Sequence, residues 1–225
     1  MSKPRLNAKQ LLSGLEHCHA ESLLFRPFYF CPGGFNLWDQ LYNSSDFNTY
    51  ALSLVARHSF GLWGTCIRYP HDLFDCYWAP FGESNSPALT SENVSVSGIW
   101  NLPLERVFQT RLTKGQPETL VLMWPPASLP NWTYYIALYI ADDHVSMSSR
   151  MLNITINGIT YYNNLSVTPA GGVVFANQWP LSGSTNLTLT PPSGSSVSPL
   201  INAGEAFQVL KIGGKTLARD VPSWL

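Results

Sequence analysis

Residues that could act as nucleophile, base and acid occur together between positions 58 and 76 of this 225-residue chain. Cys76 would be the nucleophile, and the base and orienting carboxylate would come from His58, His71, Asp72 and Asp75. A Cys-His-Asp enzyme needs these groups within hydrogen-bond reach of one another. Only proximity in the sequence links them here, and no nucleophile motif surrounds Cys76. The sequence therefore predicts no catalytic residues.

A second group with possible chemistry is Cys18, which lies between His17 and His19. These are side-chain types that bind zinc, but a zinc site needs a second set of close ligands, and the spacing of the other cysteines supplies none. We therefore expect no metal and no other cofactor. The four cysteines allow three disulfide pairings, and their spacing does not choose among them.

Six Asn-x-Ser/Thr motifs make the chain a candidate N-linked glycoprotein. Glycans on these asparagines would add polar bulk to a secreted protein. A β protein rich in Ser, Thr and Asn also forms such motifs by composition, so both interpretations stay open. The six candidate glycosylation sites are Asn43, Asn93, Asn131, Asn153, Asn164 and Asn186.

Charged residues make up only 12% of the chain, where an ordinary soluble domain carries roughly 25%. Hydrophobic residues reach 45%, and the net charge is −1. This composition excludes a disordered chain, since the apolar content is sufficient to form a core, and a coiled coil, which needs more Glu, Lys and Arg. It also argues against a nucleic-acid partner, because there is no basic excess to neutralise phosphates.

The sequence shows no recognisable signal peptide and no transmembrane segment. Polar and glycine residues at positions 14, 16, 17, 19 and 21 interrupt the apolar residues between 11 and 24. No run of about 20 apolar residues occurs further along. We therefore expect either a cytosolic protein or a piece of a longer secreted one.

The elements that would position these residues are predicted to be short strands. Residues 134–141 are aromatic, β-branched and apolar on both faces, which is typical of a central strand. A strand at 121–124 must end at Pro125, which cannot continue the hydrogen-bond ladder. Further strands are predicted at 173–176, 186–190 and 206–210, a helical turn at 106–112, and a weak amphipathic helix at 5–17.

A hairpin is predicted where residues 151–156 and 159–162 flank Asn157 and Gly158. Asn-Gly between alternating strands is the strongest short hairpin signal, because both residues tolerate a positive φ. Short strands with turn signals every 8–12 residues favour an all-β sandwich. The absence of long helical segments between the strands argues against a parallel α/β sheet.

Ordered motifs over residues 42–221 resemble a plant malectin-like domain. They are YNSSDFNTYAL at 42–52, ARHSFG at 56–61, IRYP at 67–70, FDCYWAPF at 74–81, WNLP at 100–103, VFQT at 107–110, WPP at 124–126, NITING at 153–158, QWPLSG at 178–183 and PLINAGE at 199–205. The chain most resembles the second malectin-like lobe of plant membrane proteins that carry leucine-rich repeats. The resemblance implies an all-β, jelly-roll-like antiparallel sandwich at 42–215, preceded by an atypical segment at 1–41 and followed by a tail at 216–225.

The family implies a non-catalytic module at the cell surface or in the secretory pathway. Malectin holds a sugar in surface loops, whereas some plant relatives are associated with secreted peptides. The expected partners are therefore a carbohydrate or a small secreted peptide, with a partner receptor ectodomain as a further possibility and no nucleic acid. The alternative to sugar binding is a protein-interaction module that has lost it.

The resemblance places candidate carbohydrate-binding residues in the loops at one end of the sandwich. Aromatic rings would stack on sugar C–H faces and polar groups would fix the hydroxyls. The same aromatic types often form the core of a sandwich, and Trp78 is also open to both interpretations. In this chain the loop after 134–141 lacks the aromatic pair of malectin. The candidates are Tyr77, Trp100, Phe108, Asp142, Asp143 and His144.

Overall fold

The computed structural model describes residues 50–67, 78–82, 88–90, 94, 103–143 and 150–211. Nearly all regular structure in this part of the chain is β-strand. The elements are β1 Tyr50–Phe60, β2 Ala79–Phe81, β3 Ala88–Thr90, the 3-10 helix η1 Glu105–Phe108, β4 Thr110–Thr113, β5 Leu120–Met123, β6 Leu129–Ile140, β7 Arg150–Ile156, β8 Ile159–Val167, β9 Gly172–Gly183, β10 Asn186–Thr190, β11 Leu200–Ile201 and β12 Ala203–Lys211.

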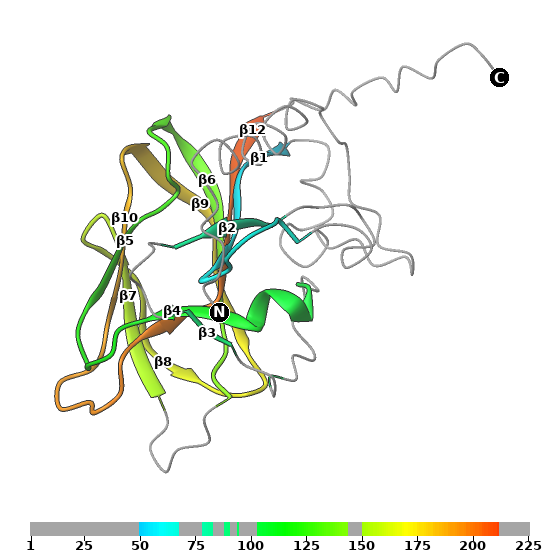
Figure 1. The fold of residues 1–225 in the computed structure, drawn as a ribbon. Coiled ribbons are helices and arrows are strands. Elements are labelled where there is room, and N and C mark those ends of the chain that lie inside the picture. The colour runs from blue at the N-terminus through cyan, green and yellow to red at the C-terminus, as the bar shows by residue number, and fades with distance from the viewer. Residues whose placement is uncertain are drawn as a thin grey trace.

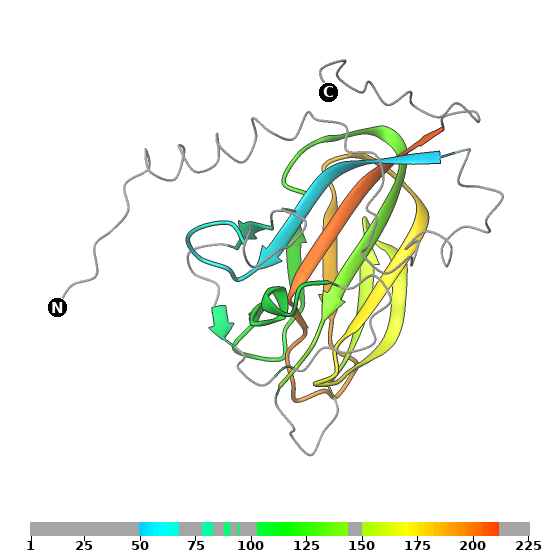
Figure 2. The same cartoon turned by 90° about the vertical axis from the view of Figure 1, so that its right-hand side faces the viewer.

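The strands form two main sheets that pack face to face (Figures 1 and 2). One has five strands in the order β2-β1-β12-β6-β9, and the other has four in the order β5-β10-β7-β8. A smaller sheet, β11-β4-β3, lies at one end. Every strand pair in the described residues is antiparallel except β1 with β2. The predicted all-β antiparallel sandwich is confirmed.

The principal core lies between the two sheets. The strands of the four-stranded sheet contribute one row of buried side chains to it and expose the other row to solvent. Buried and solvent-facing residues alternate along β5, β7 and β10. Successive side chains of a strand point to opposite faces, so this period places one row inside and one row in water. Trp124, Phe60 and Ile154 are among the largest fully buried side chains.

The five-stranded sheet differs because it is covered on both faces. In β6 every residue from Tyr134 to Ile140 is buried, so the predicted central strand is confirmed, with β12 and β9 as its neighbours. Even-numbered side chains of this stretch face the principal core, and odd-numbered ones such as Tyr139 join a second cluster on the outer face. That second cluster includes Trp78 and Phe108.

The predicted hairpin is confirmed between β7 and β8. Asn157 and Gly158 have φ values of 51° and 76°, and the turn pairs Ile156 with Ile159. The helical turn predicted at 106–112 is only partly correct. Glu105–Phe108 forms one 3-10 turn, but Thr110–Thr113 is a strand because it pairs with both β3 and β11.

Candidate functional site

The two predicted aspartates follow β6 at one end of the sandwich, where they meet two arginines. Arg111 on β4 donates from Nη1 to Asp142 Oδ1 at 3.0 Å and to Asp143 Oδ1 at 2.7 Å. Arg150, at the start of β7, donates from Nε to Asp142 Oδ2 at 2.7 Å. Arg111 is only 2% exposed and Asp142 is also buried. Both carboxylates are therefore engaged in a charged network within the fold.

This network ties together segments that are far apart in the sequence. Arg150 also donates to the carbonyl of Ser198, and the hydroxyl of Thr113 donates to the carbonyl of Pro199 at 2.8 Å. Buried charges need partners because their desolvation is costly. The arrangement accordingly serves to hold β4, β7 and the segment before β11 together at the end of β6.

The predicted aromatic ligand Phe108 is fully buried. Its ring packs edge-on against Tyr139, with the centroids 6.0 Å apart, and Trp78 packs on the same tyrosine at 5.7 Å. Asn202 fixes the backbone of this region, since its Nδ2 donates to the carbonyls of Phe108 and Thr110, both at 3.1 Å. In this structure neither ring presents a face on which a sugar could stack.

A second buried charge pair lies on the outer face of the five-stranded sheet. Arg57 contacts Glu205 at 2.5 Å between Nε and Oε1, and its guanidinium lies 5.2 Å from the centre of the Trp78 ring. The hydroxyl of Tyr139 donates to Glu205 Oε2 at 2.6 Å. Burial, with the nearby Glu205 carboxylate, raises the pKa of Tyr139 well above its usual value. The tyrosine therefore stays a neutral hydrogen-bond donor.

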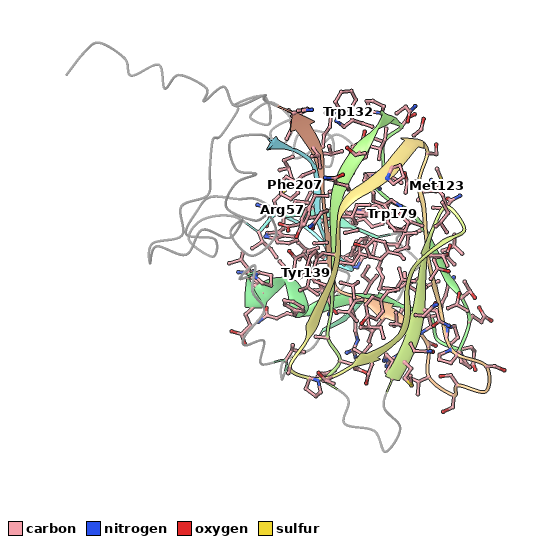
Figure 3. The ribbon with its side chains drawn as sticks, turned by 180° about the vertical axis from the view of Figure 1, so that it is seen from behind. Arg57, Met123, Trp132, Tyr139, Trp179 and Phe207 are labelled. Atoms are coloured by element: carbon pink, nitrogen blue, oxygen red, sulfur yellow. The ribbon has the colours of Figure 1, made fainter. Side chains whose placement is uncertain are left out.

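Aromatic side chains on the same face continue beyond this pair as a strip. We define the outer-face strip as Tyr135, Phe175 and Phe207. Tyr135 lies 5.9 Å from Phe207 and 6.4 Å from Phe175 between ring centres. Phe175 is 42% exposed, whereas Tyr135 and Phe207 are buried. Figure 3 shows Phe207 on the five-stranded sheet and Met123 on the other side of the sandwich.

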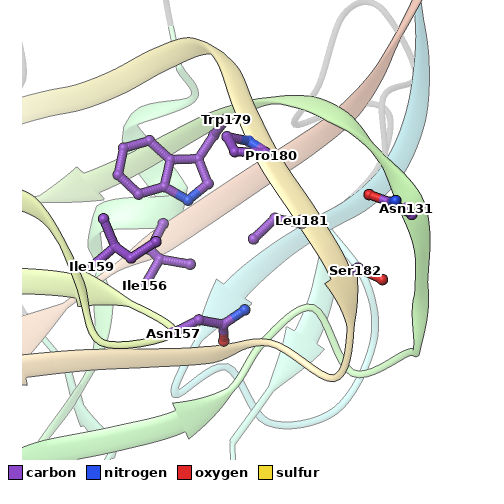
Figure 4. Close-up of a pocket in the computed structure, with 8 residues that line it drawn as sticks. All are labelled: Asn131, Ile156, Asn157, Ile159, Trp179, Pro180, Leu181 and Ser182. Carbon is purple, nitrogen blue, oxygen red and sulfur yellow. The ribbon is translucent and has the colours of Figure 1, made fainter.

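A groove of about 290 Å³ lies between the β7–β8 hairpin and β9 (Figure 4). Trp179 forms one wall, and its indole packs edge-on against Tyr161 with the centroids 5.0 Å apart. The Tyr161 hydroxyl donates to the carbonyl of Ile136 at 2.8 Å, and burial raises its pKa. None of the lining residues that the structure describes is charged, so this groove suits a neutral ligand with both apolar and hydroxyl groups. They are Asn131, Ile156, Asn157, Ile159, Trp179, Pro180, Leu181 and Ser182.

Four of the six candidate glycosylation sites fall in the described residues. Asn131, Asn164 and Asn186 are exposed, and Asn153 is half-buried with its Oδ1 accepting the Asn164 backbone N–H at 2.8 Å. Asn43 and Asn93 lie outside the described residues. All four described asparagines thus have side chains at or near the surface.

Several predicted residues lie outside the described part of the chain. They include Tyr77, Trp100, His144, the Cys18 cluster, and His71, Asp72, Asp75 and Cys76. His58 is described, and it accepts the Trp124 indole N–H on Nδ1 at 3.1 Å. Within the described ranges, no three His, Cys, Asp or Glu side chains converge to hold a metal ion. In those same ranges no helix is long and apolar enough to cross a membrane.

Sequence reasoning missed Arg57, Arg111 and Arg150, which engage the buried carboxylates. A signal was available, because each lies in or at the end of an apolar, strand-like stretch of a chain with few charges. A buried arginine in such a strand requires an acidic partner. The sequence offered no comparable indication that Trp179 would line a groove.

The architecture defines the class of molecule, an antiparallel β-sandwich with two main sheets. Residues 35–209 match the malectin-like domain family, and the chain belongs to that family. The segment predicted at 42–215 remains a prediction of the domain boundaries.

Curated relatives with similar sequences are plant receptor kinases. The chain is 30% identical over 170 residues to a nodulation receptor kinase of Pisum sativum, covering 72% of this chain and 18% of that protein. It is 26% identical over 178 residues to a probable leucine-rich-repeat receptor-like protein kinase of Arabidopsis thaliana, covering 73% of this chain and 20% of that protein. The chain therefore spans about a fifth of the length of these relatives.

Solved structures with the same fold are plant receptor ectodomains. The ANX2 ectodomain of Arabidopsis thaliana matches with a TM-score of 0.55 at 16% identity, covering 72% of this chain and 51% of that chain. A complex of the plant peptide RALF23 with FER and LLG2 matches with a TM-score of 0.57 at 17% identity, covering 72% and 50%. At 16% and 17% identity, these similarities show a shared fold alone.

Proposed function

We propose that this chain is a non-catalytic recognition module on the outside of a plant cell, within a receptor-like protein. Its partner is a protein chain, either a small secreted peptide or the ectodomain of a partner receptor. The malectin-like domain of receptor kinases belongs to their ectodomain, which supports the extracellular location. The matched relatives are receptor kinases, and this chain corresponds to about a fifth of their length.

The observation that carries the proposal is the outer-face strip. Protein interfaces are enriched in Tyr, Trp and Phe and depleted of charge at their centre. The strip joins three aromatic rings in sequence, Phe207, Tyr135 and Phe175. Phe175 is the exposed member, and the two buried rings support it from below.

The residues expected to bind sugar are engaged within the fold, which also favours a protein partner. Asp142 accepts hydrogen bonds from two arginines, and Phe108 has no exposed ring face. A partner of the peptide class is consistent with the RALF23 complex, in which a malectin-like receptor of the same fold, FER, is found with a peptide.

The test is a binding assay with the secreted domain and matched variants. Phe175→Asp and Phe175→Ser change the exposed member of the strip, whereas Met123→Ser changes a residue that is 63% exposed on the opposite sheet. Interface hot spots contribute about 2 kcal/mol or more, which is roughly a thirtyfold change in Kd. We expect that loss for a captured secreted peptide or receptor ectodomain with the strip variants and no change with Met123→Ser. Equal effects of all three variants would refute the proposal.

A second candidate function is carbohydrate binding, and the groove beside Trp179 favours it. The groove combines an indole wall with the side chains of Asn157 and Ser182, the types of group that hold sugars. Titration with oligoglucosides and oligogalacturonides, followed by tryptophan fluorescence, tests it. Saturation that is lost in Trp179→Ala supports this function, and no saturable binding at millimolar sugar excludes it.

A further inference from the structure

The groove beside Trp179 has a candidate glycosylation site on its border. Asn131 lines the groove, is exposed, and is followed by Trp132 and Thr133, which complete an Asn-x-Thr motif. Among the four motif asparagines that the structure describes, no other lines this groove. A glycan on Asn131 would therefore begin at the rim of a concave surface.

A β-bulge brings Asn131 to this position. Leu129 pairs with Gly183 and Trp132 with Leu181, so β6 has one more residue than β9 between these two pairs. Such an extra residue breaks the regular ladder and redirects the neighbouring side chains. Figure 4 shows Asn131 on β6 at one side of the groove and Trp179 on the other.

We infer that the N-linked glycan of Asn131 lies in this groove, with its sugars against Trp179 and Ile159. This inference rests on the extracellular location proposed above. The chemistry matches, because N-glycan sugars are neutral, their C–H faces pack on aromatic rings, and their hydroxyls bond to amides and hydroxyls. Asn157 and Ser182 supply such groups, and the lining residues in the described part of the chain are all uncharged.

A covalently attached glycan needs fewer contacts to occupy this groove than a free sugar does. The groove, at about 290 Å³, is at the small end of the roughly 300–1,000 Å³ range of ligand pockets. Few contacts give weak binding to a free sugar, but a covalent link raises the effective concentration to the order of millimolar or above. Because Tyr161 packs edge-on against Trp179 and is itself hydrogen-bonded, the indole is already positioned for the sugar.

The experiment measures how fast peptide N-glycosidase releases each glycan from the folded, secreted chain. Site occupancy and release are followed by mass spectrometry of glycopeptides, and each rate is divided by the rate for the denatured chain. Asn186 is the control site, since it lies on β10, pairs with Met123 of the edge strand β5, and does not itself line the groove. We expect release at Asn131 to be about two- to tenfold slower than at Asn186, the size of an aromatic packing contribution.

Two groove variants and one control variant identify the cause of the difference. Ile159→Ala removes an exposed side chain and should leave the fold intact, and Trp179→Ala removes the indole wall. Both should bring the Asn131 rate to that of Asn186. Met123→Ala, outside the groove, should leave the Asn131 rate unchanged.

Three results would overturn the inference. They are an Asn131 without glycan while other motifs are occupied, equal normalised rates at the two sites, and a slow Asn131 rate that Ile159→Ala and Trp179→Ala leave unchanged. If no motif were occupied in the secreted chain, the extracellular proposal would be contradicted as well. A failure to find a peptide partner would leave these rates unaffected, so the two proposals fail separately.

Discussion

Protonation of His58 should weaken the folded state, because its imidazole is held as a neutral acceptor. The indole N–H of Trp124 donates to Nδ1 at 3.1 Å, so the proton of the neutral ring is on Nε2. Phe81 and Trp124 pack edge-on against the ring, with centroids 5.4 and 6.4 Å away. A proton on Nδ1 would face the indole N–H, and burial disfavours the cation. Burial lowers the pKa of His58 from 6.5 to about 4.

The sign and size of the pH effect follow from the difference between the pKa of His58 in the folded and in the unfolded state. The folded state binds the proton less readily than the unfolded state, so the contribution of His58 is complete above pH 6.5 and declines as the pH falls towards 4. One pKa unit corresponds to 1.36 kcal/mol. The free energy of unfolding should therefore fall by about 2 kcal/mol between pH 7 and pH 5, and by about 3 kcal/mol at pH 4.

The assay is urea unfolding of the purified domain at pH 7 and pH 5, compared with His58→Gln. Glutamine has no charge change in this range and its Oε1 can still accept the indole N–H, so the variant should lose about 2 kcal/mol of the pH dependence. The comparison isolates His58 because every other titrating group is present in both proteins. If the two proteins show the same fall in stability from pH 7 to pH 5, the reasoning about His58 is refuted.

Three further substitutions test the packing and the buried charges. Gly204→Ala should destabilise the domain by roughly 1–3 kcal/mol, since an added Cβ would lie 2.9 Å from the Trp124 ring; a melting temperature equal to wild type would contradict this. Asp142→Asn should cost about 3–5 kcal/mol in chemical denaturation, because it leaves two arginines short of a charge; a loss below about 1 kcal/mol would show that the carboxylate is not structural. Tyr139→Phe should cost about 1–3 kcal/mol by removing the hydroxyl that donates to Glu205, and unchanged unfolding midpoints would count against that bond.

Local patterns in the sequence were sufficient for the strands and the hairpin. The Asn157-Gly158 turn was predictable because positive φ values select Asn and Gly. The β6 segment was predictable because burial on both faces selects a continuous run of apolar residues. The helical turn predicted at 106–112 was correct only for its first half. The second half became a strand through pairing with β3 and β11, and such partners do not appear in a local pattern.

The candidate site was less predictable, since a side chain's role depends on what lies opposite it. Asp142 and Asp143 stand at a strand end, which suits a ligand-binding loop as well as it suits a buried ion pair. Arg111, some thirty residues earlier, donates hydrogen bonds to both carboxylates, so in this structure they form a structural ion pair. Phe108 is equally ambiguous in sequence, and its burial against Tyr139 follows from the packing of η1 on the sheet.

By itself, the sequence determined the β-rich composition, the turn positions and the malectin-like character of the chain. These properties depend on residue types and on spacings along the chain, which a single sequence contains. Only the tertiary structure decided that Arg111 neutralises the aspartates and that Trp179 and Asn131 border one groove. These residues come from separate strands, and the register of β4, β6 and β9 brings their side chains together.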